Sequence, residues 1–260
     1  MYFLQISDSH NLCDYSKTTG LFQEAFQNLH PLKEKLEKLK EEISLPLDFI
    51  CHCGDIAHSG AQLADVTAVK ESLERLFPQV PLVVTAGNHD NRDLVQQSFL
   101  GKVSPPFVQE HSFGDLRVLS FDSSNGVFNS GEITEETATW LLEKLEEPKD
   151  TLLMSHHHLL DCQSPMPPLV SHPLFQKVLE KNHVLAYLTG HSHQGYEGKL
   201  GTIPYYTVGS FCFSTEDLGG GQHLVRESSA YHLFSYEKGQ ITLEKSGDLG
   251  FLQELGTIQK

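Results

Sequence analysis

The chain has 260 residues, of which 39% are hydrophobic and 20% are charged. This ordinary globular composition excludes a mainly disordered, collagen-like or coiled-coil protein. The chain contains 34 Asp and Glu against 19 Lys and Arg, which is a formal net charge of −15. We expect so acidic a protein to be repelled by nucleic acids and by anionic membrane surfaces, unless a local positive site overrides the field.

The beginning of the chain, residues 1–10, has neither a basic region nor a small-residue cleavage site, and no stretch reaches the ~18 apolar residues of a membrane span. These features predict a cytoplasmic protein. Cys51 and Cys53 lie in an apolar run and are expected to be buried thiols, because a single C-x-C pair is weak evidence for zinc. An odd number of cysteines without regular spacing argues against a disulfide framework. The other cysteines are Cys13, Cys162 and Cys212.

Short apolar runs rich in β-branched and aromatic residues alternate with helical patterns through the first 190 residues. This alternation predicts the α/β class, in one domain over residues 1–260, with residues 200–260 mainly β. The predicted strands are residues 2–7, 47–53, 81–85, 116–122, 151–155, 184–189, 203–208, 230–236 and 240–245.

Helical spacing of apolar residues is found in five segments between these strands. In residues 32–43, leucine and isoleucine recur every three or four positions, and the charged residues between them predict a solvated face. Thr134 is placed to cap another helix, because acidic residues follow it in the first turn. Residues 214–223 are predicted to be a mobile loop, either a plain surface loop or a lid near a site. The predicted helices are residues 32–43, 61–77, 92–99, 134–146 and 174–181.

Residues that can bind metals or act in catalysis directly follow five of the predicted strands. A single aspartate or histidine in such a place is usually a turn, cap or surface residue. Five in succession are a stronger signal, because α/β proteins place ligands at the carboxyl ends of their strands. The segments are Asp8-Ser9-His10, Gly54-Asp55, Gly87-Asn88-His89-Asp90, His156-His157-His158 and Gly190-His191-Ser192-His193.

The donor atoms in these segments suit divalent transition metals, which take carboxylate oxygens and imidazole nitrogens. Asp8 and His10 can reach one ion from one loop, and Asp55 can bridge two ions with its two oxygens. Asn88 offers a neutral amide oxygen, which leaves His89 to act on a substrate. Two divalent ions would make such a centre positive in an acidic protein, and a pair of this kind suits in-line displacement at phosphorus.

In this order the five segments resemble the motifs of the calcineurin-like metallophosphoesterase family, over about residues 2–193. Residues 87–92, Gly-Asn-His-Asp-Asn-Arg, look most like the class III cyclic-nucleotide phosphodiesterase branch, which also includes glycerophosphodiesterases. Residues 132–145 are similar to the helix that precedes the fourth motif in that branch. The resemblance implies a four-layer α/β/β/α sandwich of two mixed β-sheets flanked by helices.

The resemblance also implies a centre of two transition metal ions (Mn, Fe, Zn or Co) and hydrolysis of a phosphate ester by a metal-bound hydroxide. His89 would protonate the leaving alkoxide, and Asp90 would orient His89. The implied ligands are Asp8, His10 and His193 for one metal, Asn88, His156 and His191 for the other, and Asp55 as the bridge.

The sequence departs from the family pattern in the fourth motif. The branch usually reads His-His-Pro-Pro, whereas residues 156–159 read His-His-His-Leu. A position directly after the strand favours His156 as the ligand over His158. His58 stands where the family often has Asn or Asp, and it either contacts the substrate or caps its loop. Arg92 is either a contact to the substrate phosphate or part of an ion pair at the start of a helix.

The leading functional hypothesis is a phosphodiesterase that acts on a small diester of the cyclic-nucleotide or glycerophosphodiester type. A phosphomonoesterase using the same site is the alternative, and a non-catalytic scaffold is a third, disfavoured because the ligand set is complete. The net charge of −15 and the absence of a basic stripe around the motifs argue against a nucleic acid polymer as substrate. No membrane partner is expected, and a homodimer is possible because dimers are common in the branch.

Overall fold

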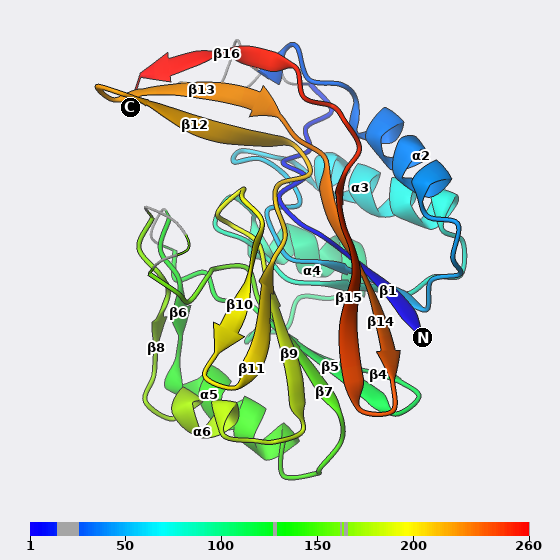
Figure 1. Cartoon of the computed structure of the whole chain (residues 1–260), viewed down its shortest axis with the longest axis vertical. Helices are drawn as coiled ribbons and strands as arrows, with labels where there is room; N and C mark the ends of the chain where they lie inside the picture. The colour runs from blue at the N-terminus through cyan, green and yellow to red at the C-terminus, as the bar shows by residue number, and fades with distance from the viewer. Residues whose placement is uncertain (15–25, 127–128, 162, 164–165, 260) are drawn as a thin grey trace.

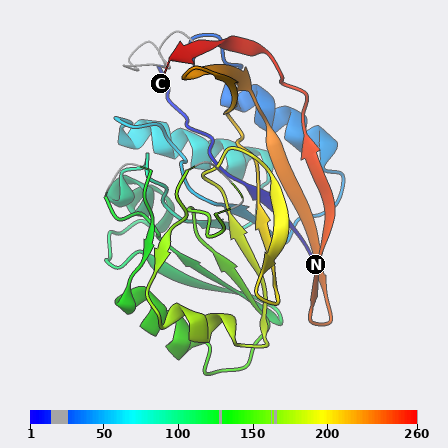
Figure 2. The same ribbon diagram turned by 60° about the vertical axis from the view of Figure 1, so that its left-hand side comes forward.

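Two β-sheets face each other in this protein, and helices cover the outer face of each sheet (Figure 1). Figure 2, turned by 60°, shows the same layers, with the two helices nearest the N-terminus at the opposite end of the molecule from the two nearest residue 150. Among the described residues, no helix combines the length and the apolarity needed to cross a membrane. The computed structural model describes residues 1–14, 26–126, 129–161, 163 and 166–259.

The first sheet has five strands in the order β15–β14–β1–β2–β3. Strands β1, β2 and β3 are parallel, and β14 and β15 complete the sheet as antiparallel strands. Parallel pairing matters here because it brings the carboxyl ends of β1, β2 and β3 to the same edge. The strands are β1 (Tyr2–Ile6), β2 (Phe49–His52), β3 (Leu82–Val84), β14 (Ala230–Glu237) and β15 (Gln240–Asp248).

The second sheet has six strands in the order β10–β11–β9–β7–β5–β4. The four inner strands run parallel, and the two edge strands β4 and β10 are antiparallel to their neighbours. The strands are β4 (Val108–Phe113), β5 (Leu116–Phe121), β7 (Thr151–Met154), β9 (Val184–Thr189), β10 (Tyr196–Leu200) and β11 (Ile203–Thr207).

Strand β1 shows how one short segment contributes to two cores. Phe3 lies between the sheets, where its ring stacks on Phe49 and Phe234 at centroid distances of 4.7 and 5.0 Å. Leu4 and Ile6 lie on the opposite face and pack in the core formed with the helices. Successive side chains of a strand alternate between faces, so a strand buried on both faces appears as a continuous apolar run.

The helices close the two outer cores. Helices α2 (Leu32–Glu42), α3 (Leu63–Leu76) and α4 (Arg92–Leu100) pack against the first sheet, and α5 (Glu135–Lys144) and α6 (Phe175–Leu179) pack against the second. With the core between the sheets, this gives the layers helix, sheet, sheet, helix. The predicted α/β class and the two mixed sheets flanked by helices are confirmed.

The prediction of a mobile loop at residues 214–223 is wrong, because this segment forms most of an antiparallel hairpin. Gly219–Gly221, all with positive φ, lie at its tip. Such a backbone favours glycine. The strand pattern is weak in the sequence because few side chains of this small sheet, such as Phe213 and Val225, are buried. The third sheet consists of β12 (Phe213–Gly219), β13 (Gln222–Glu227) and β16 (Glu254–Gln259).

The sequence also did not predict the edge strands β4 and β10, because polar residues occupy their half-exposed positions. A two-stranded sheet of β6 (Glu132–Ile133) and β8 (Val170–Ser171) is too short to leave a pattern in the sequence.

Cys51 and Cys53 are buried free thiols, as predicted, whereas Cys162 lies outside the described residues. The assignment of the whole chain to one domain stays a prediction.

Lys35 is an exception to the predicted solvated face of α2. Its side chain is only 2% exposed, and its Nζ lies 2.8 Å from Oε1 of the buried Glu227. The same ammonium donates to the main-chain carbonyls of Cys212 and Ser228, at 3.1 and 3.0 Å. This buried ion pair ties the hairpin of the third sheet to the helix layer of the first sheet.

We expect Lys35→Met to lower the free energy of unfolding by about 3–5 kcal/mol, because it removes the ammonium from the buried Glu227 carboxylate and leaves that carboxylate with its contacts to His30. Urea denaturation of the purified protein measures this. The matched control is Lys33→Met on the same helix, where the Lys33 side chain is 59% exposed. That change should stay within about 0.5 kcal/mol of wild type. Equal losses in the two variants would contradict the role of the pair.

Candidate metal centre

The seven predicted metal ligands all lie where strands end. Strands β1, β2 and β3 belong to the first sheet and β7 and β9 to the second, so the residues converge where parallel strands of both sheets stop. The structure brings all seven together. They are Asp8 and His10 after β1, Asp55 after β2, Asn88 after β3, His156 after β7, and His191 and His193 after β9.

One group of four residues has its ligand atoms within 4.8 Å of one another, namely Asp8, His10, Asp55 and His193. His10 Nε2 lies 3.1 Å from His193 Nε2 and 3.6 Å from Asp55 Oδ2. Asp8 Oδ1 lies 3.3 Å from His193 Nε2. Two imidazoles and two carboxylates at these separations form a set of donors that could surround a single small cation.

A second set of donors lies on the other side of Asp55. His156 Nε2 is 3.2 Å from both Asn88 Oδ1 and His191 Nδ1. The same nitrogen is 3.4 Å from Asp55 Oδ2, the oxygen that also faces His10 of the first group. One carboxylate oxygen is therefore shared by two donor sets. This is the position that a bridging ligand takes between two metal ions.

Each buried carboxylate is oriented by the backbone of another loop. Asp8 Oδ2 accepts a hydrogen bond from the main-chain N–H of His191 at 3.0 Å. Asp55 Oδ1 accepts one from the main-chain N–H of His89 at 2.8 Å. In both residues one oxygen is thus held by a neighbouring motif, and the other oxygen faces the donor atoms of the centre.

His156 is oriented in a similar way. Its Nδ1 lies 2.7 Å from the main-chain carbonyl oxygen of Cys53, to which it donates a hydrogen bond. Donation from Nδ1 directs Nε2 toward the other ligands, as is usual for histidines that bind metals. Sequence reasoning did not identify this contact, because a backbone carbonyl leaves no mark in the residue pattern.

The backbone of the centre is strained. Non-glycine residues with φ between about +40° and +70° are uncommon and cost of order 1–3 kcal/mol each. They persist where the surrounding structure requires them, and they cluster at functional sites. Five of the seven candidate ligands have this conformation. They are Asp8 (φ 55°), His10 (42°), Asp55 (49°), His191 (71°) and His193 (58°).

Two glycines explain why the loops can approach so closely. A Cβ atom on Gly87 would lie 2.1 Å from Asp55 Oδ1, and one on Gly190 would lie 1.9 Å from Ser7 Oγ and 2.6 Å from Asp8 Oδ2. No side chain fits in either place. Each glycine immediately precedes a candidate ligand, so it lets that ligand's loop reach the carboxylate of another loop.

The electrostatics of the centre suit a cation. Burial raises the pKa of Asp55, but His156 and His89 outweigh this effect and hold that pKa well below its usual value. Burial lowers the pKa of His10 and His191 well below the ordinary histidine value. Burial also lowers the pKa of His156, but Asp55 outweighs it and raises the pKa to about 10. Ionised carboxylates and neutral imidazoles are the forms that bind metals, so His156 would give up its proton when a metal binds.

A buried oxygen without a hydrogen bond supports the same conclusion. Asp8 Oδ1 is inaccessible and accepts no hydrogen bond from the described residues, apart from its ion-pair contact with His193 Nε2 at 3.3 Å. An orphaned carboxylate oxygen is costly in a protein interior unless a cation neutralises it. The donor types, their burial and this oxygen therefore fit two transition metal ions.

His89, the predicted proton donor, lies at the edge of the centre. Its Nδ1 is 2.8 Å from Ser59 Oγ, a contact that the sequence did not predict. The His58 ring stacks on the His89 ring at a centroid distance of 5.1 Å, and His58 Nδ1 is 3.3 Å from His10 Nδ1. His58 therefore lies among the candidate site residues, and its contact with a substrate stays a prediction.

The Asp90 carboxylate is held by backbone N–H groups of two loops. Its carboxylate accepts hydrogen bonds from the main-chain N–H groups of Ile56, Ala57 and Gly87, at 3.1, 2.9 and 2.9 Å. These contacts join the loop that carries Asp55 to the loop that carries Asn88. The predicted role of Asp90 in orienting its neighbour His89 is not tested by them and stays a prediction.

The run of three histidines divides into different environments. His157 contacts Ser123 Oγ through Nδ1 at 2.9 Å. Its ring lies 4.4 Å from the ring of His191, so it packs against that candidate ligand. His158 Nε2 lies 3.1 Å from the carbonyl oxygen of Met166. This geometry favours His156 over His158 as the ligand, in line with its position directly after β7.

Arg92 forms an ion pair with Asp122, and its Nη2 donates to the main-chain carbonyl of Ser124 at 2.8 Å. The ion-pair alternative considered for Arg92 is therefore present in the structure. A contact with the substrate is compatible with it, because the Arg92 side chain remains 46% exposed.

Comparisons with known sequences agree with the motifs. The family model described as calcineurin-like phosphoesterase matches residues 1–195. A Rhodococcus erythropolis protein named "Probable cyclic nucleotide phosphodiesterase" is 27% identical over 233 residues, which cover 85% of this chain and 75% of that protein. A protein of the same name from Vesicomyosocius okutanii is 28% identical over 205 residues, covering 75% of this chain and 80% of that protein.

Solved structures show the same fold at low sequence identity. A purple acid phosphatase from yellow lupin superimposes with a TM-score of 0.61 at 13% identity, over 99% of this chain and 53% of that chain. A dimetal phosphatase from Danio rerio superimposes with a TM-score of 0.58 at 14% identity, over 99% of this chain and 98% of that chain.

We expect Asp55→Asn to reduce the metal content of manganese-loaded protein from about two ions per chain to one or none, because it removes the negative charge that both donor sets share. Elemental analysis by mass spectrometry measures the content. Asp93→Asn, at an exposed position in the first turn of α4, is the control and should retain both ions. Two ions in the Asp55 variant would contradict the assignment of a shared ligand.

Proposed function

This chain belongs to the calcineurin-like phosphoesterase family, and we propose that it hydrolyses a small phosphodiester at a centre of two metal ions. The observation that carries the proposal is the single oxygen, Asp55 Oδ2, that faces both donor sets at 3.6 and 3.4 Å. Two ions held at such a site supply Lewis acidity and an activated water for displacement at phosphorus.

The residues divide between two metal positions. Asp55 lies between the two positions, so it is assigned to both. Imidazole, carboxylate and amide donors suit Mn, Fe, Zn or Co, and these are the metals that we propose. The first position would be held by Asp8, His10 and His193, and the second by Asn88, His156 and His191.

His89 is proposed to deliver the proton to the leaving alkoxide. Because Ser59 Oγ engages Nδ1 at 2.8 Å, we assign the transferred proton to Nε2. The main chain of His89 is itself fixed by its hydrogen bond to Asp55 Oδ1, so the ring starts from a backbone anchored to the centre. A positioned general acid of this kind typically contributes 10²- to 10⁴-fold to the rate, as an order of magnitude.

Several observations support a small diester as the substrate. The relatives from Rhodococcus and Vesicomyosocius carry the name of cyclic nucleotide phosphodiesterases, which favours a diester of the cyclic-nucleotide or glycerophosphodiester type over a phosphomonoester. The net charge of −15 disfavours a nucleic acid polymer. A cytoplasmic location and a homodimer remain predictions.

The test is a paired rate measurement on metal-loaded protein. Bis-p-nitrophenyl phosphate and p-nitrophenyl phosphate are offered at equal concentration, and release of p-nitrophenolate is followed. We expect the diester to be hydrolysed faster. Faster hydrolysis of the monoester would favour the alternative function, a phosphomonoesterase. Failure to hydrolyse either ester with two metals bound would favour the non-catalytic scaffold.

Replacing the proposed general acid should separate chemistry from metal binding. We expect His89→Ala to lower kcat at least about 100-fold on a diester with an alkoxide leaving group, such as a cyclic nucleotide, because the alkoxide needs the proton. Two metal ions should remain bound, because His89 is not among the assigned ligands. His223→Ala, on β13 in the third sheet, is the control and should keep the wild-type rate. A wild-type rate in the His89 variant would sink the assigned role.

A further inference from the structure

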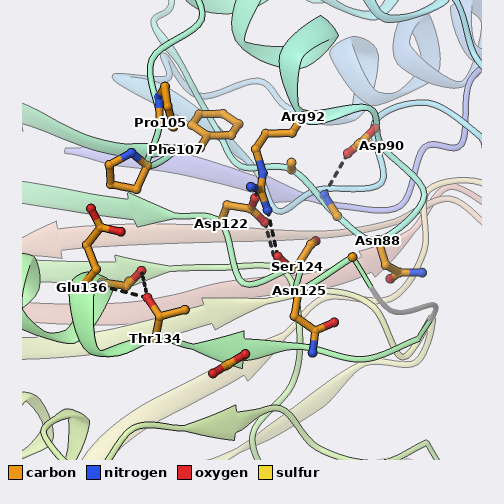
Figure 3. Close-up of a pocket in the computed structure, with 16 residues that line it drawn as sticks. Asn88, Asp90, Arg92, Pro105, Phe107, Asp122, Ser124, Asn125, Thr134 and Glu136 are labelled. Atoms are coloured by element: carbon orange, nitrogen blue, oxygen red, sulfur yellow. Dashed lines mark hydrogen bonds and ion pairs between the residues drawn. The ribbon is translucent and has the colours of Figure 1, made fainter.

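A cavity of about 910 Å³ lies beside the metal centre (Figure 3), within the size range of small-molecule sites. Asn88, a candidate ligand, forms part of its wall. If phosphorus is attacked at the centre, as proposed above, one ester group of the substrate has room in this cavity. The nature of its wall then decides which ester groups fit.

Arg92 is the only basic residue among those of the described chain that line the cavity. Its Nε contacts the carboxylate of Asp122, whose side chain is only 5% exposed, and its Nη2 donates to the carbonyl oxygen of Ser124. The charge of this guanidinium is therefore balanced by a buried partner, and its direction is fixed. It can donate hydrogen bonds into the cavity, but it does not make the wall positive.

Acidic residues outnumber this one cation. Glu132 and Glu136 line the cavity, are exposed, and come from β6 and from the first turn of α5. In Figure 3, Glu136 and Asn88 lie at opposite sides of the cavity, so an ester group long enough to cross the cavity from Asn88 would approach Glu136. A second phosphate or a carboxylate on that group would meet excess negative charge, whereas a neutral or cationic group would not.

We propose that this cavity receives the ester group that is not displaced, and that Glu136 makes the site select uncharged or cationic ester groups over anionic ones. Glu136 is thus a specificity-determining residue for the proposed diester hydrolysis. Substrates with one phosphate and a neutral or cationic organic group satisfy this wall, and diesters that carry a further phosphate do not.

Three aryl diesters with the same leaving group test the proposal. The first is p-nitrophenyl phosphorylcholine, and the second is its neutral isostere, 3,3-dimethylbutyl p-nitrophenyl phosphate, in which carbon replaces the quaternary nitrogen. The third is the anionic 3-carboxypropyl p-nitrophenyl phosphate. We expect kcat/KM to fall in the order cationic, neutral, anionic, by about 3-fold at each step, as for partly exposed charge interactions.

Two substitutions at one position locate the effect. Glu136→Gln should reduce the cationic-to-neutral ratio of kcat/KM toward one, and Glu136→Lys should reverse the preference. Glu143→Lys, on the same helix but outside the cavity wall, is the control and should leave the ratio unchanged. Because both esters are measured on one preparation, the ratio does not depend on the fraction of protein that is folded.

The outcomes separate this proposal from the function on which it rests. If none of the three esters is hydrolysed, the proposed diesterase function fails. If the anionic ester is hydrolysed as efficiently as the neutral and cationic esters, or if Glu136→Lys leaves the ratios of kcat/KM unchanged, the diesterase function stands and the role of the cavity wall is overturned.

Discussion

The arrangement of the loops around the centre depends on two buried carboxylates, each of which contacts both a neighbouring loop and the candidate metal centre. Asp8 and Asp55 each give one oxygen to a main-chain N–H of a different loop, and each presents the other oxygen to the centre. These contacts lock together loops that follow four strands in two sheets, namely β1 with β9 and β2 with β3. They also require positive φ at both aspartates and glycine at positions 87 and 190. Part of the backbone strain therefore lies at the two residues whose carboxylates contact both a neighbouring loop and the centre.

These two carboxylates also place negative charge in the interior of the protein. Asp8 and Asp55 are buried, and their pKa values are held down by histidines rather than by lysine or arginine. His156, with a pKa raised to about 10 by Asp55, carries a proton in the absence of another cation. Metal ions held by these residues would take the place of that proton and would neutralise Asp8 Oδ1. The free-energy cost of burying these carboxylates would thus be offset when metal ions bind.

Much of this architecture could be predicted from the sequence, because the buried strands β1, β2, β7 and β9 are apolar on both faces and are followed at once by polar residues. The features that could not be predicted depend on hydrogen bonds to the backbone, or on strands that bury few side chains. The acceptor for His156 is a carbonyl, and the Asp90 carboxylate binds main-chain N–H groups. The hairpin of β12 and β13 was mistaken for a loop because its small sheet buries few side chains.

The centre and the adjoining cavity share Asn88 and its loop but otherwise draw on different parts of the chain, and this separates the proposed chemistry from the proposed selectivity. All seven candidate ligands follow parallel strands, and their geometry is fixed by contacts between loops. Most of the cavity wall instead comes from the start of α4, the loops before β4 and after β5, and the segment from β6 into α5. Glu136 shares no contact with a candidate ligand among the described interactions, so its charge can change without altering the donor set. One metal centre can therefore serve different esters through changes confined to the wall.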